Sequence, residues 1–304
     1  MNEYVIGIDL GGTKIEGCLM NENKEVLSRE RVPSNHNQGV EVIINTISNL
    51  CKTVSEGVKI EAIGIGTPGT LIESTNTLFG LPQSPNYGTP GFLNLLEKKV
   101  QKPLIIENDA NCLALAEFFA TDEKNYSHVM AVILGTGVGS GLILDKKLYR
   151  GKNGGAGEFG HTTINYLGRQ CSCGRKGCVQ TYISGPAIEE RYKEISNESV
   201  SAKEIYQRYL KKEEDASRII EDSLSIFGEA IGNMANVFDL DAVILGGGVS
   251  NMPVWYENTS SYLKNVFFGL ERKDFPILKA KLGDSAGVIG AAYLALRHIG
   301  KVDF

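Results

Sequence analysis

One pattern occurs twice in this 304-residue chain: an apolar run, a glycine-rich turn, a second strand-like run and a hairpin turn. The first copy begins with residues 4–10 and turns at 11–14, and the second begins with residues 130–134 and turns at 135–141. Short apolar runs bounded by glycine are typical of buried strands. The recurrence therefore predicts an α/β chain built from two diverged copies of one βββαβα plan.

Other segments predict the rest of this plan. Apolar residues at helical spacing predict helices at 40–54, 110–119, 186–194, 216–238 and 286–297. Ser201 and Glu204 form a capping-box pattern for a further short helix. Residues 70–92 are rich in Pro, Gly, Asn, Ser and Thr, and we expect a long irregular loop there. We place the first domain at 1–117 plus about 290–304 and the second at 118–289.

Composition excludes several classes of partner. The net charge is −5 and Lys and Arg are scattered along the chain, so we expect no nucleic-acid partner. No apolar stretch approaches the roughly 20 residues that span a bilayer. Glu3 and Asp9 stand around the first apolar run, which is unlike a signal peptide. These two features lead us to expect no membrane partner. Because Cys18, Cys51 and Cys112 have no evident disulfide partners, we expect a reducing compartment and thus a cytoplasmic protein.

Four possible metal ligands lie within eighteen positions: His161, Cys171, Cys173 and Cys178. Thiolate and imidazole groups suit Zn²⁺, and the glycines between them let the backbone curl round a small ion. Four protein ligands close the coordination shell, so the predicted zinc is structural. The alternative is a disulfide or a set of separate buried thiols, although Cys171 and Cys173 are too close for an easy bridge.

Three glycine turns, each after a buried strand, are candidates for binding phosphate through backbone N–H groups. The first two match neither a Walker A motif nor the G-x-G-x-x-G pattern of dinucleotide sites. Taken alone, each turn is a weak signal and is more simply an ordinary turn at a strand end. Their recurrence in two halves favours phosphate binding. The candidate positions are Gly11, Gly12, Thr13 and Lys14; Gly135, Thr136 and Gly137; and Gly246, Gly247 and Gly248.

Two aspartates stand at predicted strand ends. Asp9 lies two residues before the first glycine turn, where its carboxylate could hold Mg²⁺ through water; the alternative is a turn-stabilising role. Asp109 follows the strand at 104–106 and could accept a hydroxyl proton during phosphoryl transfer. Asn108 or Asp109 could instead cap the helix that begins at Ala110, and spacing alone does not separate these roles.

Taken together, these segments resemble the ROK sugar kinases over nearly the whole chain. The resemblance rests on seven motifs in order: Asp-Leu-Gly-Gly-Thr-Lys at 9–14, Gly-Ile-Gly-Thr-Pro-Gly at 64–69, Glu-Asn-Asp-Ala-Asn at 107–111, Leu-Gly-Thr-Gly-Val-Gly at 134–139, Gly-Glu-Phe-Gly-His at 157–161, the three cysteines at 171–178, and Ile-Leu-Gly-Gly-Gly at 244–248.

This resemblance implies the actin-like, ribonuclease-H-like fold, with two duplicated α/β domains, a cleft where ATP and sugar meet, and a small zinc-binding insertion in the second domain. It implies transfer of the ATP γ-phosphate to the 6-hydroxyl of a hexose with Mg²⁺, and a homodimer. Asp109 would be the general base. The other sugar contacts would be Gly69, Asn108, Glu158 and His161, the last also a zinc ligand. The glycines at 246–248 would lie on the adenosine side.

Two positions depart from the family pattern. Gln180 stands where relatives have a sugar-contacting Glu, so it keeps an acceptor oxygen but loses the charge. A loop Asn that contacts sugar in some relatives corresponds to Asn86 or to Gln83.

The stretch from residue 266 to 287 is similar to the fructokinase (manno(fructo)kinase) branch, so we predict D-fructose as the substrate, with glucose and mannose as further candidates. The alternative is an N-acetylhexosamine, either N-acetylglucosamine or N-acetylmannosamine. A non-catalytic sugar sensor is a remote alternative. The repressor branch of the family carries a helix-turn-helix domain before the first glycine turn, and this chain reaches that turn at Asp9.

Overall fold

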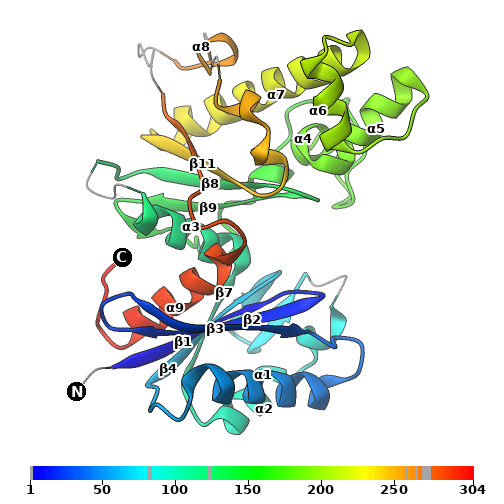
Figure 1. Ribbon diagram of the computed structural model, residues 1–304. Coiled ribbons are helices and arrows are strands. Elements are labelled where there is room, and N and C mark those ends of the chain that lie inside the picture. The colour runs from blue at the N-terminus through cyan, green and yellow to red at the C-terminus, as the bar shows by residue number, and fades with distance from the viewer. Residues whose placement is uncertain (1–2, 81–83, 122–124, 258, 264–265, 269–274) are drawn as a thin grey trace. The chain divides into compact units, whose positions relative to one another are not determined.

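The computed structural model describes residues 3–80, 84–121, 125–257, 259–263, 266–268 and 275–304. Contacts within the chain divide it into two compact units (Figure 1). The first unit comprises Met1–Ala120, Lys147–Ala156 and Asp284–Phe304, and the second comprises Thr121–Lys146 and Gly157–Gly283. The sequence-based boundaries at 117 and about 290 lie a few residues from these divisions, and they assigned 147–156 to the second domain.

The first unit contains a five-stranded sheet in the order β3-β2-β1-β4-β7. Strand β1 runs antiparallel to β2 and parallel to β4, which is in turn parallel to β7. The carboxyl ends of β1, β4 and β7 therefore lie at one edge of the sheet. The strands are β1 (Tyr4–Leu10), β2 (Lys14–Asn21), β3 (Val26–Pro33), β4 (Ala62–Thr67) and β7 (Leu104–Asn108).

Helices cover both faces of this sheet (Figure 1). One face packs against α1 (Val40–Ser55) and α2 (Phe92–Val100), whose apolar residues share a core with the isoleucines of β1. On the other face α9 (Ala286–His298) packs beside α3 (Asp109–Ala120). Helix α9 comes so close to β4 that a Cβ at Gly64 would lie 1.8 Å from the carbonyl oxygen of Ala291. Only glycine fits at that position.

The expectation of a long irregular loop at 70–92 is wrong. Strands β5 (Thr70–Ile72) and β6 (Thr77–Phe79) form an antiparallel hairpin, and a 3₁₀ turn, Pro85–Gly88, follows. The triplets Thr-Leu-Ile and Thr-Leu-Phe favour β structure, and the side chain of Leu78 in the second triplet is buried. The polar residues of the turn dominated the composition of the segment and hid these short strands.

The second sheet has the order β10-β9-β8-β11-β12. Strand β8 runs antiparallel to β9 and parallel to β11, which repeats the relations of β1 to β2 and β4. This shared order confirms the predicted duplication. The strands are β8 (Val129–Leu134), β9 (Val138–Leu144), β10 (Lys147–Leu148), β11 (Ala242–Gly246) and β12 (Ile277–Lys279).

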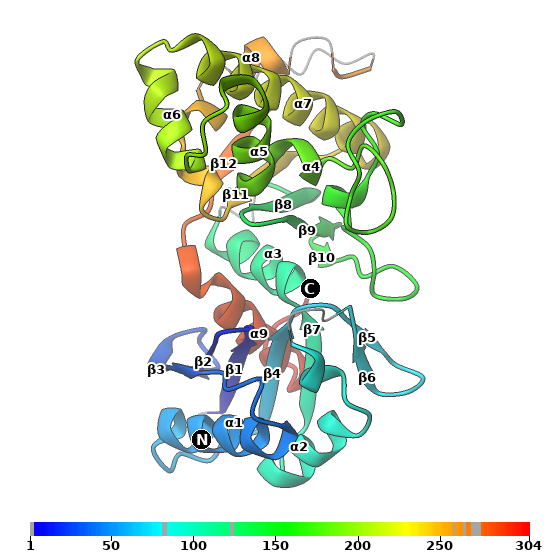
Figure 2. The ribbon, with the colours of Figure 1, turned by 90° about the vertical axis from the view of Figure 1, so that its right-hand side faces the viewer.

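A group of helices packs on the sheet of the second unit (Figure 2). The long helix α7 places Phe227 and Ile231 in a core with Val132, Leu134 and Trp255. Ser201 caps α6 by accepting a hydrogen bond from the N–H of Glu204 at 3.2 Å, as the capping-box pattern predicted. The helices are α4 (Gln180–Ile183), α5 (Gly185–Ser196), α6 (Ala202–Leu210), α7 (Glu214–Phe238) and α8 (Thr259–Tyr262). In the described part of the chain, no helix is both long and apolar enough to cross a membrane.

Candidate active site

Four of the predicted site residues meet at the carboxyl edge of the first unit's sheet. Asp9 pairs with Gly66 across β1 and β4, and Thr67 pairs with Asn108 across β4 and β7. The amide of Asn108 donates a hydrogen bond from Nδ2 to the carbonyl oxygen of Gly69 at 2.9 Å. This register brings Asp9, Gly69, Asn108 and Asp109 to one edge of the sheet, although they come from three separate segments of the sequence.

The structure separates the two roles proposed for Asn108 and Asp109. The N–H of Ala110, two residues after Asn108, donates to Asn108 Oδ1 at 2.9 Å, which is the pattern of an N-cap. Asp109 Oδ1 accepts from the same N–H at 2.8 Å, but an N-cap accepts from residues two or three positions further on. Asn108 therefore has the geometry of the cap. Asp109 is half-buried at the first position of α3.

Asp9 has an unfavourable environment for its charge. Burial, followed by the charges of Asp109 and Glu16, raises the pKa of Asp9 from 3.8 to about 7, and the opposing effects of Lys14 and Arg31 are smaller. Clustered carboxylates of this kind are stabilised by a cation, and oxygen ligands are those that Mg²⁺ prefers. The carboxylates around Asp9 therefore fit the Mg²⁺ predicted there from the sequence. The charge of Asp109 is close enough to affect Asp9.

The first glycine turn is held through its carbonyl groups. Tyr87 donates from its hydroxyl to the carbonyl oxygen of Gly11 at 2.9 Å, and Ser34 donates from Oγ to that of Gly12 at 2.6 Å. The backbone N–H of Ser34 donates to the carbonyl oxygen of Thr13 at 3.0 Å. Thr13 and Lys14 are exposed. The sequence did not single out Ser34 or Tyr87, because a hydroxyl that supports a turn from a distant segment has no local signature.

The loop residue Asn86 lies in the 3₁₀ turn next to Tyr87. Its Nδ2 donates to the carbonyl oxygen of His36 at 2.6 Å, so its amide N–H₂ group anchors the turn to another loop of the same unit. Gln83, the other candidate for this role, lies outside the described residues. The assignment of Asn86 as a sugar contact stays a prediction.

The second and third glycine turns lie side by side in the second unit. A Cβ at Gly247 would lie 2.4 Å from the carbonyl oxygen of Leu134, and the φ of Gly247 is +89°, so only glycine fits there. The N–H of Gly185, at the start of α5, donates to the carbonyl oxygen of Gly135 at 2.9 Å. Thr136 and Gly137 remain exposed.

A cavity of about 1050 Å³ opens beside these two turns. A cavity of this size is at the upper end of the range for small-molecule sites. The lining combines the backbone of the glycine turns with apolar side chains, and a nucleotide can use both. Its lining includes Gly135, Thr136, Gly248, Tyr206, Leu210 and Met252.

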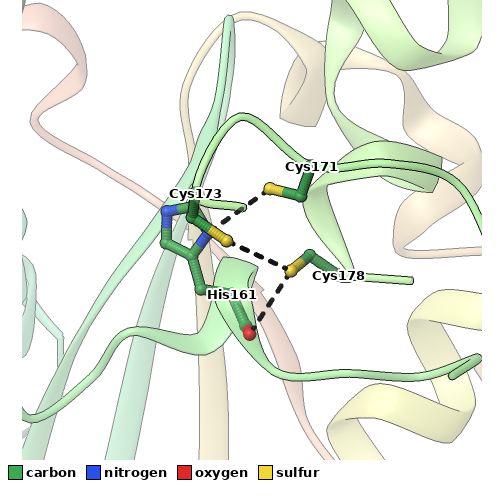
Figure 3. A group of neighbouring side chains, drawn as sticks. All are labelled: His161, Cys171, Cys173 and Cys178. Atoms are coloured by element: carbon green, nitrogen blue, oxygen red, sulfur yellow. Dashed lines mark hydrogen bonds between the residues drawn. The ribbon is translucent and has the colours of Figure 1, made fainter. Parts of the chain in front are cut away.

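The four predicted zinc ligands converge in the second unit (Figure 3). Their ligand atoms all lie within 4.8 Å of one another. The Sγ of Cys171 lies 3.6 Å from Nδ1 of His161, and the Sγ atoms of Cys173 and Cys178 lie 3.7 Å apart. Tetrahedral Zn²⁺ with ordinary bond lengths places a sulfur and a nitrogen about 3.6 Å apart and two sulfurs about 3.8 Å apart. The set therefore fits zinc.

Charge in this cluster also favours a metal. Burial raises the pKa of Cys171, but hydrogen bonds from the backbone of Cys173, from the other thiols and from Gln180 outweigh burial and bring it to about 6. Burial and the two neighbouring thiols raise the pKa of Cys178 to about 12. Three sulfurs so close together can all be thiolates only with a cation between them. None of the six cysteines forms a disulfide.

Gln180 points at the cluster. Its Nε2 donates a hydrogen bond to the Sγ of Cys171 at 3.2 Å. A Cβ added at Gly137 would lie 3.5 Å from the Oε1 of Gln180. Gln180 thus links the cysteine cluster to the second glycine turn. Glu158 is exposed at the start of the 3₁₀ turn Phe159–His161, and its carbonyl oxygen accepts from the N–H of His161 at 3.0 Å. The sugar-contacting roles of Glu158, His161 and Gln180 stay predictions.

Comparison with known proteins gives a consistent result. Residues 5–298 match the sequence profile described as the ROK family. The chain is 36% identical over 305 residues to the N-acetyl-D-glucosamine kinase of Haemophilus influenzae, covering 95% of this chain and 98% of that protein.

Two solved structures are also similar. The ROK hexokinase from Thermus thermophilus has a TM-score of 0.89 at 30% identity, with 98% of this chain and all of that chain covered. A ROK family glucokinase from Streptomyces griseus, in complex with glucose and AMPPNP, has a TM-score of 0.78 at 30% identity, with 97% and 99% covered.

Proposed function

Because the chain belongs to the ROK family, we propose that it transfers the γ-phosphate of ATP to the 6-hydroxyl of an N-acetylhexosamine, with N-acetyl-D-glucosamine as the preferred sugar. The family match and the relatives identify an ATP-dependent sugar kinase. They also confirm the actin-like, ribonuclease-H-like fold that the sequence predicted.

The choice of sugar rests on one observation. Three N-acetyl-D-glucosamine kinases are 35–36% identical to this chain, which covers 98% of each of them. This similarity favours the N-acetylhexosamine alternative over the D-fructose that the sequence predicted. The fructokinase-like stretch at 266–287 contains none of the proposed sugar contacts, so it is a weak guide to the sugar.

In the proposed reaction Asp109 is the general base. It would accept the proton of the sugar 6-hydroxyl as that oxygen attacks the γ-phosphorus and ADP leaves. Asn108 supports this role, because it caps α3 and is tied to Gly69, and so fixes the corner that carries Asp109. The carboxylate of Asp9 lies at the same edge of the sheet, and the charge of Asp109 is one of the causes of its raised pKa. Mg²⁺ held near Asp9 would neutralise phosphate charge when bound.

The nucleotide would bind the glycine turns. Backbone N–H groups at 11–13 and 135–137 would donate to phosphate oxygens, and the cavity beside Gly248 would take the adenosine. The exposure of Thr13, Lys14, Thr136 and Gly137 supports this assignment, since these groups are accessible to a ligand.

The zinc would be structural. His161, Cys171, Cys173 and Cys178 would close its coordination shell and fix the segment that carries Glu158 and Gln180. Glu158, His161, Asn86 and Gln180 are retained as proposed sugar contacts. A homodimer and a cytoplasmic location also stay predictions.

A sugar panel tests the proposal. Purified protein with MgATP is incubated with N-acetylglucosamine, N-acetylmannosamine, glucose, mannose and fructose, and ADP release is followed. We expect the fastest turnover with N-acetylglucosamine. Turnover confined to fructose would restore the earlier prediction, and no turnover with any sugar would remove the kinase assignment.

A further inference from the structure

A buried carboxylate stands directly before the proposed base. Glu107 ends β7 next to Asn108 and is only 4% exposed. Its Oε1 accepts hydrogen bonds from the backbone N–H of Asn108 at 2.9 Å and from Nδ2 of Asn111 at 3.0 Å. Its Oε2 lies 2.7 Å from Nε of Arg150. A buried carboxylate needs donors and positive charge in place of water. The two N–H groups donate to it, and the guanidinium of Arg150 supplies the charge.

Arg150 reaches Glu107 from a separate segment of the chain. Residues Lys147–Ala156 belong to the first unit although their neighbours in sequence on both sides belong to the second. The Nη1 of Arg150 also lies 3.5 Å from Oε1 of Glu73, in the turn of the β5–β6 hairpin. A Cβ on Gly154 would lie 3.1 Å from Cγ2 of Thr70. These contacts seat the segment on the hairpin and on the end of β7.

We propose that Arg150 is a positioning residue for the phosphoryl transfer and acts through Glu107. The inference rests on the proposed function. The ion pair holds the Glu107 carboxylate in the orientation that binds the N–H of Asn108 and the side chain of Asn111, and so fixes the corner that presents Asp109. The same ion pair anchors the segment Lys147–Ala156 within the first unit.

Removal of the guanidinium leaves a buried carboxylate without its positive charge. The carboxylate then turns towards water, and this movement releases the N–H of Asn108. A shift of about 1 Å at a catalytic group costs on the order of 100-fold in rate. Neither residue was singled out by the sequence, because their partnership joins positions 43 residues apart.

The kinetic test uses Arg150→Gln, Arg150→Lys, Glu107→Gln and the double variant Glu107→Gln/Arg150→Gln. Arg208→Gln is the matched control, because Arg208 also pairs with two carboxylates, those of Glu198 and Glu204. It belongs to the second unit and does not line the proposed adenosine cavity. We expect Arg150→Gln to lower kcat about 10- to 100-fold, with KM for ATP changed less than about 3-fold. Arg150→Lys, which keeps the charge, should recover part of the loss.

The double variant should be more active than Arg150→Gln, because it removes the uncompensated charge. Arg208→Gln should stay within about 2-fold of the wild type. Equal kcat for Arg150→Gln and Arg208→Gln, with both proteins folded, would overturn the proposal and leave the ion pair only a contribution to stability.

Hydrogen exchange gives a readout that does not depend on activity. In Arg150→Gln the amides of residues 108–111 and 148–156 should exchange faster, while those of β1 and β8 should not. Unchanged exchange at 108–111 would also overturn the proposal. If the wild type phosphorylates no sugar, the proposed function fails, and the exchange experiment still decides whether Arg150 fixes this corner. If the wild type is active and Arg150→Gln equals it, only the positioning role fails.

Discussion

Asp9→Asn should stabilise the protein while it removes activity. The substitution keeps the shape of the side chain and removes a charge that burial, Asp109 and Glu16 make unfavourable. The pKa of Asp9 is about 7 in the folded chain against an ordinary value of 3.8, a difference that corresponds to at most ~4 kcal/mol of unfolding free energy. The folded state therefore binds this proton more tightly than the unfolded state.

The sign of the pH dependence follows from the raised pKa. Protonated Asp9 contributes stability at pH 4 and below, and this contribution is lost as pH rises through about 7. Between pH 8 and pH 5 the wild type should gain about 3 kcal/mol from this group, a gain that Asp9→Asn lacks. The variant should thus be the more stable protein at pH 8, and its advantage should shrink as pH falls.

Urea unfolding of both proteins at pH 8, 7, 6 and 5, without Mg²⁺ or nucleotide, measures this difference. Asp303→Asn, at an exposed carboxylate, is the control and should show no such trend. Two results would refute the conclusion that the charge of Asp9 destabilises the fold and is retained for function. One is an Asp9→Asn variant that is less stable than the wild type at pH 8. The other is a difference in unfolding free energy between the two proteins that does not change with pH.

Three further predictions concern the base and the zinc cluster. Asp109→Asn should lower kcat about 10²- to 10⁴-fold with little change in nucleotide affinity, measured by calorimetry. Activity within 10-fold of the wild type would show that Asp109 is not the general base. Cys178→Ser should abolish the binding of about one zinc per chain and lower the Tm. The control Cys51→Ser, at a buried thiol outside the cluster, should keep the zinc. Freshly purified wild-type protein that contains no zinc by metal analysis would contradict the assignment. Gln180→Glu should speed the loss of zinc to a coloured chelator about 10-fold, because a carboxylate cannot donate a hydrogen bond to the Cys171 thiolate and repels it. The control Gln38→Glu, at an exposed position, should not change this rate. Equal rates for the two variants would show that Gln180 does not support the metal.

The architecture of each unit could be predicted because its signal is periodic and local. Two apolar runs, residues 4–10 and 130–134, each lead into a glycine turn. This repeated pattern was enough to predict the duplication, which the strand orders of the two sheets confirm. The hairpin at 70–79 was missed, because two three-residue strands lie below the length at which alternation can be recognised.

The site was predicted only in part, for a related reason. The spacing of His161 and the three cysteines identified the four residues that converge, since metal ligands close in sequence can meet within one segment. The capping role of Asn108, the link from Gln180 to Cys171 and the pairing of Arg150 with Glu107 each depend on how a side chain is oriented by distant segments. The identity of the sugar depends on such details of shape, and only the comparison with relatives favours an N-acetylhexosamine over the predicted fructose.

The central claim is tested most directly by the ratio of kcat/KM for N-acetyl-D-glucosamine to that for D-fructose, with the phosphorylated product identified by NMR. We predict a ratio of at least about 100 and a phosphate on the 6-oxygen of N-acetylglucosamine. A ratio below one, or a phosphate on any other oxygen, would contradict the account.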